Sequence, residues 1–201
     1  MSIKTLLVVM LTLTLAAGCG KKEGPAGKTP ASKSIEGLNV KEVEVSQYVN
    51  QAIEQNDKGN YTEALDLLKK AYESDNADES IRKGITTVYS NLCAVLVKSG
   101  EYEWAERNLE EALELIPVNP DMEKKYALVL AKHAQSEFGS GNRQNAVKLL
   151  ETAVIHDGSN ADILGLLGDY YYKTDNNTGA IECCEKALAL NPADYGLQKK
   201  T

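Results

Sequence analysis

Six side chains in this sequence could carry out nucleophilic, redox or metal chemistry. They are four cysteines and two histidines: Cys19, Cys93, His133, His156, Cys183 and Cys184. Thiolates and imidazoles act as nucleophiles, bases or metal ligands when other ionisable groups converge on them. The sequence holds no H-E-x-x-H, G-x-S-x-G, Walker-type phosphate loop or C-x-x-C-H motif to supply such groups. We therefore expect no enzyme activity, no metal site and no cofactor.

The stretch around Cys19, LTLTLAAGCGKKEG, has the pattern of a processed N-terminus. Lys4 provides a positive start, residues 6–17 are apolar, and residues 16–18 are small. The apolar run is shorter than the about 20 residues that a membrane-spanning helix needs. The pattern resembles the lipobox of bacterial lipoproteins, although Ala16 stands where that family prefers a bulkier residue. The resemblance implies that residues 1–18 are a lipoprotein signal peptide and that Cys19 is acylated, with palmitate on it. Ordinary signal cleavage is the alternative.

Residues 19–37 are predicted to form a flexible tether. They are rich in Gly, Pro, Ser and Lys and lack apolar periodicity, so they cannot bury enough surface to become ordered. Fully extended, such a segment reaches about 60 Å. In Gram-negative lipoproteins a residue other than Asp after the acylated cysteine, here Gly20, implies export to the outer membrane. The resemblance thus implies a lipid-anchored protein of the bacterial cell envelope, held in the outer membrane through Cys19 and facing the periplasm.

Alanine recurs in pairs, seven residues apart, through the rest of the chain. The pairs are Ala64/Ala71, Ala105/Ala112, Ala146/Ala153 and Ala180/Ala187. Seven residues are close to two helical turns, so each pair lies on one face, where small side chains let helices approach closely. This pattern resembles the tetratricopeptide repeat (TPR), a helix-turn-helix unit of 34 residues. The resemblance implies an all-α fold: an α-solenoid of four such repeats behind the signal peptide and the flexible linker.

The resemblance also sets domain boundaries. It places a solenoid domain over residues 38–201, with repeats at about 45–78, 86–119, 127–160 and 161–194. The first three repeats start 41 residues apart, seven more than the family length. Because seven residues add nearly two turns, the extra segments Glu79–Ile85 and Pro120–Tyr126 are predicted to lengthen the first helices of repeats two and three and to pack together.

The turns between paired helices should need a residue that tolerates positive φ. Gly59, Gly100 and Gly141 provide it in the first three repeats, and Asp175 replaces it in the fourth. Pro117 and Pro192 are expected to end second helices, since proline has no N–H to continue the hydrogen-bond ladder.

Other side chains that could react are expected to have structural roles within the helix pairs. Cys93 occupies a small-residue position of the repeat and Cys184 a position that is otherwise leucine, so both are expected to be packing residues. His133 lies one turn before Glu137, and we predict a hydrogen bond between them.

An acidic stripe runs along the second helix of repeat two. It is predicted either to face solvent or to dock a basic partner. It comprises Glu101, Glu103, Glu106, Glu110, Glu111 and Glu114.

In the tetratricopeptide family the first helices of the repeats line a concave groove that binds peptides or partner helices. Carried over position by position, the resemblance assigns this groove to Val49, Ile53, Asn91, Ala94, Val97, Leu128, Gln135, Phe138, Asp169 and Tyr172. Val49 and Ile53 stand where the family's carboxylate clamp has Lys and Asn, which argues against recognition of a free carboxylate tail. The apolar character suits an amphipathic helix or an extended segment. The chain's own apolar residues 35–45 could instead cover nearby surface.

Composition narrows the function further. A net charge of −7 argues against duplex nucleic acid, which needs a basic face. We therefore expect a membrane-anchored envelope lipoprotein that acts as a protein–protein interaction adaptor or scaffold in the assembly of a pilus or secretion complex. The alternatives are an adaptor for outer-membrane protein or cell-wall enzyme assembly, or a self-assembling structural spacer. The last repeat has no full capping helix after it, so we expect that its C-terminal end is either covered by another protomer, in a homo-oligomer, or simply tolerated as it is.

Overall fold

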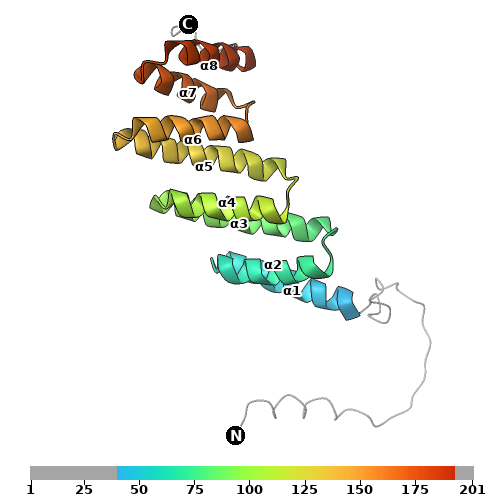
Figure 1. Ribbon diagram of the computed structural model, residues 1–201. Coiled ribbons are helices and arrows are strands. Elements are labelled where there is room, and N and C mark those ends of the chain that lie inside the picture. The colour runs from blue at the N-terminus through green and yellow to red at the C-terminus, as the bar shows by residue number, and fades with distance from the viewer. Residues whose placement is uncertain (1–39, 193–201) are drawn as a thin grey trace, which may run out of the picture. The chain divides into compact units, whose positions relative to one another are not determined.

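The computed structural model describes residues 40–192, which are entirely helical apart from turns and short connections. Figure 1 shows the helices stacked in chain order. They are α1 (Val40–Asp57), α2 (Tyr61–Ser74), α3 (Glu79–Ser99), α4 (Tyr102–Leu115), α5 (Pro120–Gly139), α6 (Arg143–His156), α7 (Ala161–Lys173) and α8 (Asn177–Leu190). The predictions for residues 1–18, for the tether and for Cys19 lie outside the described residues.

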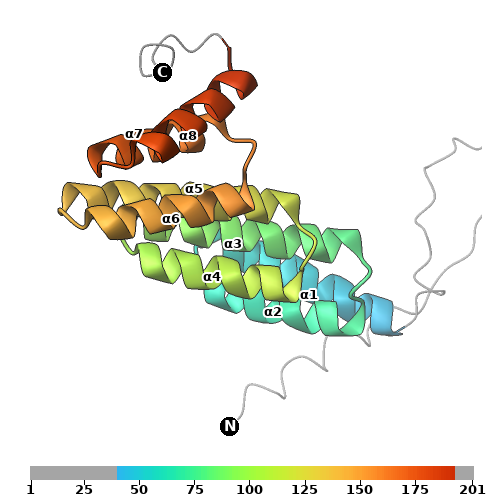
Figure 2. The same ribbon diagram turned by 45° about the horizontal axis from the view of Figure 1, so that its top comes forward.

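Residues 38–201 form one compact unit in which each helix packs on the next. The helices fall into four antiparallel pairs, α1/α2, α3/α4, α5/α6 and α7/α8 (Figure 2). All eight alanines of the repeat are buried, with exposed fractions between 0% and 7%. An alanine presents almost no side chain, so the facing helix can approach closely. The predicted all-α solenoid of four helix pairs is therefore confirmed.

The first helices of the second and third pairs are extended as predicted. α3 begins at Glu79 and α5 at Pro120, so both seven-residue segments are helical. Ile81, Ile85 and Met122 are almost completely buried, and Tyr126 is 6% exposed. α1 also starts early, at Val40, so it includes Val43 and Val45, of which Val45 packs against the core. That part of residues 35–45 is therefore not a separate covering segment.

A turn residue in the left-handed region ends each first helix. Gly59, Gly100 and Gly141 have φ angles of 79°, 81° and 91°. Asp175 takes the same conformation with a φ of 64°, although it carries a side chain. Left-handed backbone is routine for Gly and tolerated by Asp, so the fourth turn keeps the geometry of the others at a steric cost.

A second set of small residues lies on the first helices of the pairs. Ala52, Cys93 and Ala134 are fully buried at equivalent positions, and Gly168 continues the series in α7. A Cβ built on Gly168 would lie 3.0 Å from the Cys184 Sγ atom and 3.3 Å from the Ala180 carbonyl oxygen. This close approach of α7 to α8 requires glycine, and it explains the residue by packing alone.

Within residues 40–192, no helix combines the length and the hydropathy that crossing a bilayer would require.

Candidate functional site

The ten predicted groove residues all lie on the first helices of the pairs, as the repeat register requires. Val49 and Ile53 lie on α1, and Asn91, Ala94 and Val97 lie on α3. Leu128, Gln135 and Phe138 lie on α5, and Asp169 and Tyr172 lie on α7. Ile53, Leu128 and Tyr172 are large apolar or aromatic residues with 54%, 49% and 70% of their surface exposed. All three side chains are exposed to solvent on first helices of the pairs.

In the N-terminal half of this surface, most of the predicted groove residues already contact other residues of the stack. The Asn91 side-chain amide donates a hydrogen bond of 2.9 Å to the Asn56 side-chain oxygen, joining α3 to α1. Val49 and Val97 are half-buried against the core, and only Ile53 and Ala94 are exposed. Asn91 therefore links two repeats through this hydrogen bond and also occupies a groove position.

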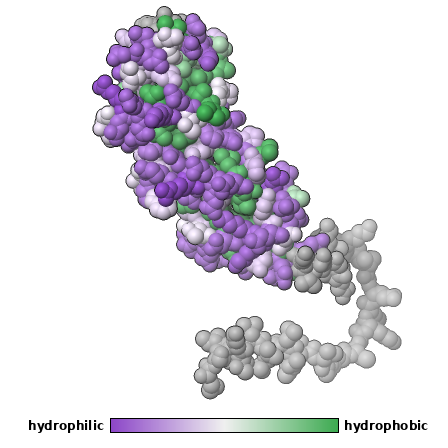
Figure 3. Space-filling model, in the orientation of Figure 1, coloured by the Kyte–Doolittle hydropathy of each residue, from purple (hydrophilic) through white to green (hydrophobic). Residues whose placement is uncertain are grey.

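The C-terminal half is richer in exposed and aromatic groups. The Phe138 ring stacks on Tyr170 with a centroid distance of 3.9 Å. The Arg143 guanidinium lies 5.7 Å from the Phe138 ring centre, and the Lys173 ammonium lies 5.3 Å from it. Such cation–π contacts hold two positive charges beside the aromatic pair. Figure 3 shows apolar surface interrupting the hydrophilic exterior, with several patches towards the C-terminal helices.

The structure corrects the predicted partner of His133. Its Nδ1 atom lies 2.7 Å from a carboxylate oxygen of Glu106 on α4, and its ring stacks on Tyr102 at 5.2 Å. Glu137, the predicted partner, instead accepts hydrogen bonds from Asn142 and Asn145. Spacing of four residues along a helix allows a contact, but His133 faces the preceding helix pair and is only 7% exposed. Burial raises the pKa of the Glu106 carboxyl, and its bond to His133 opposes that rise.

The acidic stripe is solvated only in part. Glu106 bonds to His133, and Glu110 accepts a 2.6 Å hydrogen bond from the Tyr126 hydroxyl of α5. Glu111 forms an ion pair of 2.5 Å with Lys69 of α2. Half of the stripe thus links α4 to the neighbouring pairs, while Glu101, Glu103 and Glu114 are exposed.

Sequence reasoning missed a repeated carboxylate contact between helix pairs. Glu110 and Glu151 each lie two residues before the second alanine of their repeat. Each accepts a 2.6 Å hydrogen bond from a tyrosine of the next first helix, Tyr126 and Tyr171 respectively. Burial, followed by the neighbouring carboxylate, raises the pKa of both phenols, so the hydroxyls stay protonated as donors. Glu110 and Glu151 occupy the same position of the repeat, and this was the signal in the sequence from which the contact could have been predicted.

His156 also pairs across helices. Its Nδ1 atom bonds to Glu123 of α5, and its ring packs at a tilt on Tyr126 with centroids 4.5 Å apart. The pair borders a cleft between the α4–α5 and α6–α7 connections, also lined by Pro117, Val118 and Asp157. Asp157 is buried and accepts a hydrogen bond from the Ser159 hydroxyl. These bonds hold the two connections in place.

The cysteines of the described chain are packing residues. Cys93, Cys183 and Cys184 are buried. Burial raises the pKa of the Cys93 thiol to about 11 and also raises that of Cys183, which disfavours the reactive thiolate. No cluster of His, Cys, Asp and Glu among residues 40–192 has the geometry to hold a metal ion.

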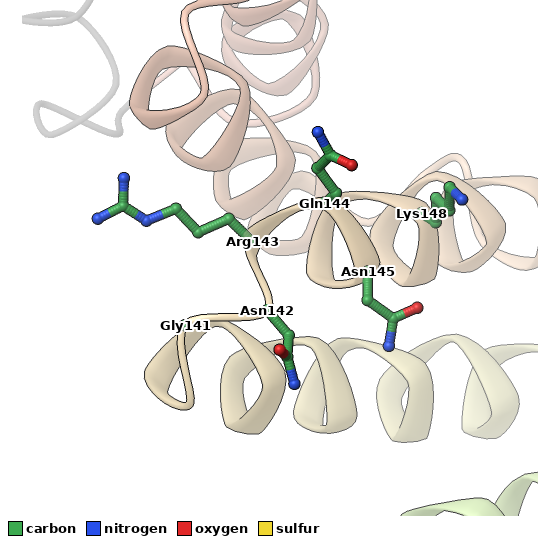
Figure 4. A pocket seen from close by; sticks show the side chains of 6 residues that line it. All are labelled: Gly141, Asn142, Arg143, Gln144, Asn145 and Lys148. Carbon is green, nitrogen blue, oxygen red and sulfur yellow. The ribbon is translucent and has the colours of Figure 1, made fainter.

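A hollow of about 480 Å³ lies at the turn between α5 and α6. Figure 4 shows the Arg143 side chain extending away from it, with Asn142 and Asn145 directed towards α5. Those two amides are the ones that bond to Glu137. The hollow therefore collects polar groups that serve the turn, and they do not converge on a ligand position.

The helix pairs and the exposed face of their first helices define a helical-repeat scaffold. Residues 131–195 match the model of the tetratricopeptide repeat family, which supports that repeat across the C-terminal helix pairs. Repeats of this family are protein–protein interaction modules.

The solved structures similar to this chain include other repeat proteins. "Crystal structure of MamA protein" is 17% identical, with 78% of each chain covered and a TM-score of 0.45. A tetratricopeptide repeat protein from Parabacteroides merdae is 18% identical, with 79% of this chain and 57% of that chain covered and a TM-score of 0.47. YrrB, described as a TPR protein with an unusual peptide-binding site, is 19% identical, with 81% and 99% covered and a TM-score of 0.40. No curated protein matches the chain.

Proposed function

We propose that this chain is a lipid-anchored adaptor of the bacterial cell envelope that binds a protein partner on the face of its first helices. The observation that carries the binding role is the exposure of Ile53, Leu128 and Tyr172 on equivalent helices of a stack whose core is filled without them. Large apolar side chains gathered on one surface are typical of a protein-binding site. The lipobox resemblance at Cys19 supports the anchor and the location in the outer membrane, facing the periplasm.

The C-terminal half of that face is the stronger candidate for the contact. Leu128 shares α5 with Phe138 of the Phe138–Tyr170 stack and Tyr172 shares α7 with Tyr170, whereas Asn91 in the other half is already bonded to Asn56. An aromatic pair and exposed apolar groups on the same two helices can bury the side chains of an amphipathic helix or an extended segment. Arg143 and Lys173 beside the ring supply a polar rim that orients the bound segment.

Assembly of a pilus or secretion complex is the process we favour, by resemblance to lipoproteins of this design. Adaptors of outer-membrane protein insertion and of cell-wall enzymes share that design and form the alternative. All three require one partner on the same face, so identifying the partner distinguishes them.

Photo-crosslinking in intact cells tests the binding role. A photoreactive residue at Tyr172 should crosslink to one protein, and the same probe at the exposed Lys70 on α2 should not. Adding Leu128→Asp to the Tyr172 probe should abolish the adduct, because it places a charge in the apolar contact. Equal crosslinking from both positions, or an adduct insensitive to Leu128→Asp, would place the partner elsewhere.

A further inference from the structure

Two basic side chains lie against one aromatic ring in the C-terminal half of the first-helix face. The Phe138 ring stacks on Tyr170, and the Arg143 guanidinium and the Lys173 ammonium lie 5.7 Å and 5.3 Å from the centre of the Phe138 ring. Arg143 is the first residue of α6 and Lys173 is the last residue of α7. Both therefore stand beside turns between paired helices, outside the ten predicted groove positions. We call Arg143 and Lys173 the cation pair.

The cation pair has no ion-pair partner among residues 40–192. All ion pairs in that part of the chain involve other basic residues. Glu137 directly precedes Phe138, but its carboxylate accepts hydrogen bonds from the side-chain amides of Asn142 and Asn145. The first turn of α6 contains no acidic residue. The cation pair thus keeps its positive charge in a chain whose net charge is −7.

Contact with the ring leaves both cations able to bind an anion. A guanidinium held over an aromatic face keeps its N–H donors at the edge of its plane, where a carboxylate can accept two of them. The Lys173 ammonium carries three donors, and it also lies 5.8 Å from the centre of the Tyr170 ring. Both basic side chains are exposed, so an incoming group can reach them. Because the rings already restrict these long side chains, binding costs less side-chain entropy than it would for free ones.

Exposed apolar groups lie on the helices that carry the aromatic stack. Leu128 shares α5 with Phe138 and is 49% exposed, and Tyr172 directly precedes Lys173 on α7 and is 70% exposed. Asp169 is the only acidic residue among the ten groove positions, and it is half-buried. A segment bound here would meet apolar contacts together with positive charge. Negative charge on the segment makes it complementary to this surface.

We infer that the partner segment bound on the first-helix face carries an Asp or Glu side chain next to its apolar anchor residues, and that this carboxylate pairs with Arg143 and Lys173. The inference rests on the proposed function and adds the chemistry of the partner. A side-chain carboxylate is meant, since Val49 and Ile53 replace the residues that hold a free carboxylate tail in this family. An uncharged or basic segment with the same apolar residues would leave the cation pair without a partner in the interface, so it should bind less well.

Charge reversal combined with photo-crosslinking in intact cells tests this inference. A chain with the photoreactive residue at Tyr172 and with Arg143→Glu and Lys173→Glu should give about tenfold less adduct than the same probe alone, because like charges then face each other. Lys70→Glu with Lys186→Glu is the matched control. It changes the net charge equally, at exposed positions on α2 and α8, and the adduct should be unchanged. Thermal unfolding of both variants checks that they remain folded.

A charge swap gives the second measurement. Mass spectrometry of the adduct locates the partner segment, and we expect an Asp or Glu within about four residues of the crosslinked position, one helical turn. Changing that residue to Lys should restore the adduct of the Arg143→Glu, Lys173→Glu chain to about half of the original yield or more. The same change should weaken crosslinking to a chain that keeps both basic residues.

The outcomes separate this inference from the proposed function. An adduct that persists after charge reversal, an equal loss in the Lys70→Glu, Lys186→Glu control, or a crosslinked segment without a nearby Asp or Glu would overturn the inference. Each of these results would leave a partner bound on the first-helix face. If the Tyr172 probe alone gave no adduct, the proposed function itself would be contradicted, and the inference would fall with it.

Discussion

At the scale of single residues, the carboxylates of this chain connect one helix pair to the next. Glu106, Glu110 and Glu151 each accept a hydrogen bond from a side chain of the following first helix. Glu106 is the most enclosed of them, with 16% of its side chain exposed. An ionised carboxylate loses hydration when it is buried, and one or two hydrogen bonds offset that loss only in part.

Glu106→Gln should therefore change stability in a pH-dependent way. Because the folded-state pKa of Glu106 is raised, its contribution to stability is fully present below the unfolded pKa and is lost as pH rises through the folded value. Gln stays neutral and can still accept from His133. Near pH 7.5 the variant should match or exceed the wild type in free energy of unfolding, by up to about 1 kcal/mol, and this difference should shrink towards pH 5.

Urea unfolding at a series of pH values measures this effect. Glu103→Gln is the control, since Glu103 lies 3.7 Å from the same ring with 70% of its side chain exposed, and the substitution should change little. A loss of more than about 1 kcal/mol for Glu106→Gln at pH 7.5 would show that the ionised carboxylate is a net stabilising partner of His133.

At the scale of elements, the four turns between paired helices share one backbone conformation with different residues. Asp175→Gly should raise the free energy of unfolding by about 0.5–1 kcal/mol, because glycine adopts the φ of 64° without steric cost. Gly100→Ala is the reciprocal variant. Gly100 has a φ of 81°, and a Cβ there would meet nothing within 4 Å. The substitution should therefore lower the free energy of unfolding by about 1 kcal/mol through backbone strain alone. Thermal unfolding of both variants checks this, and destabilisation by Asp175→Gly would assign the Asp175 side chain a stabilising role.

The elements were predictable where the signal is local. Alanine pairs and turn glycines fixed the helix pairs, and the seven-residue excess of the early repeats predicted that α3 and α5 start at Glu79 and Pro120. The partner of His133 was predicted wrongly, because the spacing to Glu137 describes one helix while stacking brings Glu106 closer. The groove positions follow from the repeat register. The exposure of each groove residue does not follow from the register, because it depends on how neighbouring helices meet. The hydrogen bond between Asn91 and Asn56 is an example.

At the scale of the whole molecule, the proposed function assigns separate tasks to the described helices and to the N-terminal segment. Each described helix pair contacts only its neighbours, so stability is spread along the stack. Replacing a residue outside the stack should therefore change location without changing fold, and replacing a buried one should do the reverse. Cys19 and Cys93 offer that comparison with the same residue type.

Cys19→Ser should move the protein from the membrane fraction to the soluble fraction, because a hydroxyl does not take the place of the acylated thiol and the acyl chains would be lost. Attached chains bind a bilayer by about 0.8 kcal/mol per buried methylene, so their loss removes the anchor. The thermal midpoint of the purified variant should be unchanged. Cys93→Ala should stay in the membrane fraction and unfold at a lower temperature, since Cys93 is fully buried and its sulfur fills core volume. Membrane fractionation of Cys19→Ser that matches the wild type would reject lipidation at this residue, and the Leu128 and Tyr172 face would then act without the proposed anchor.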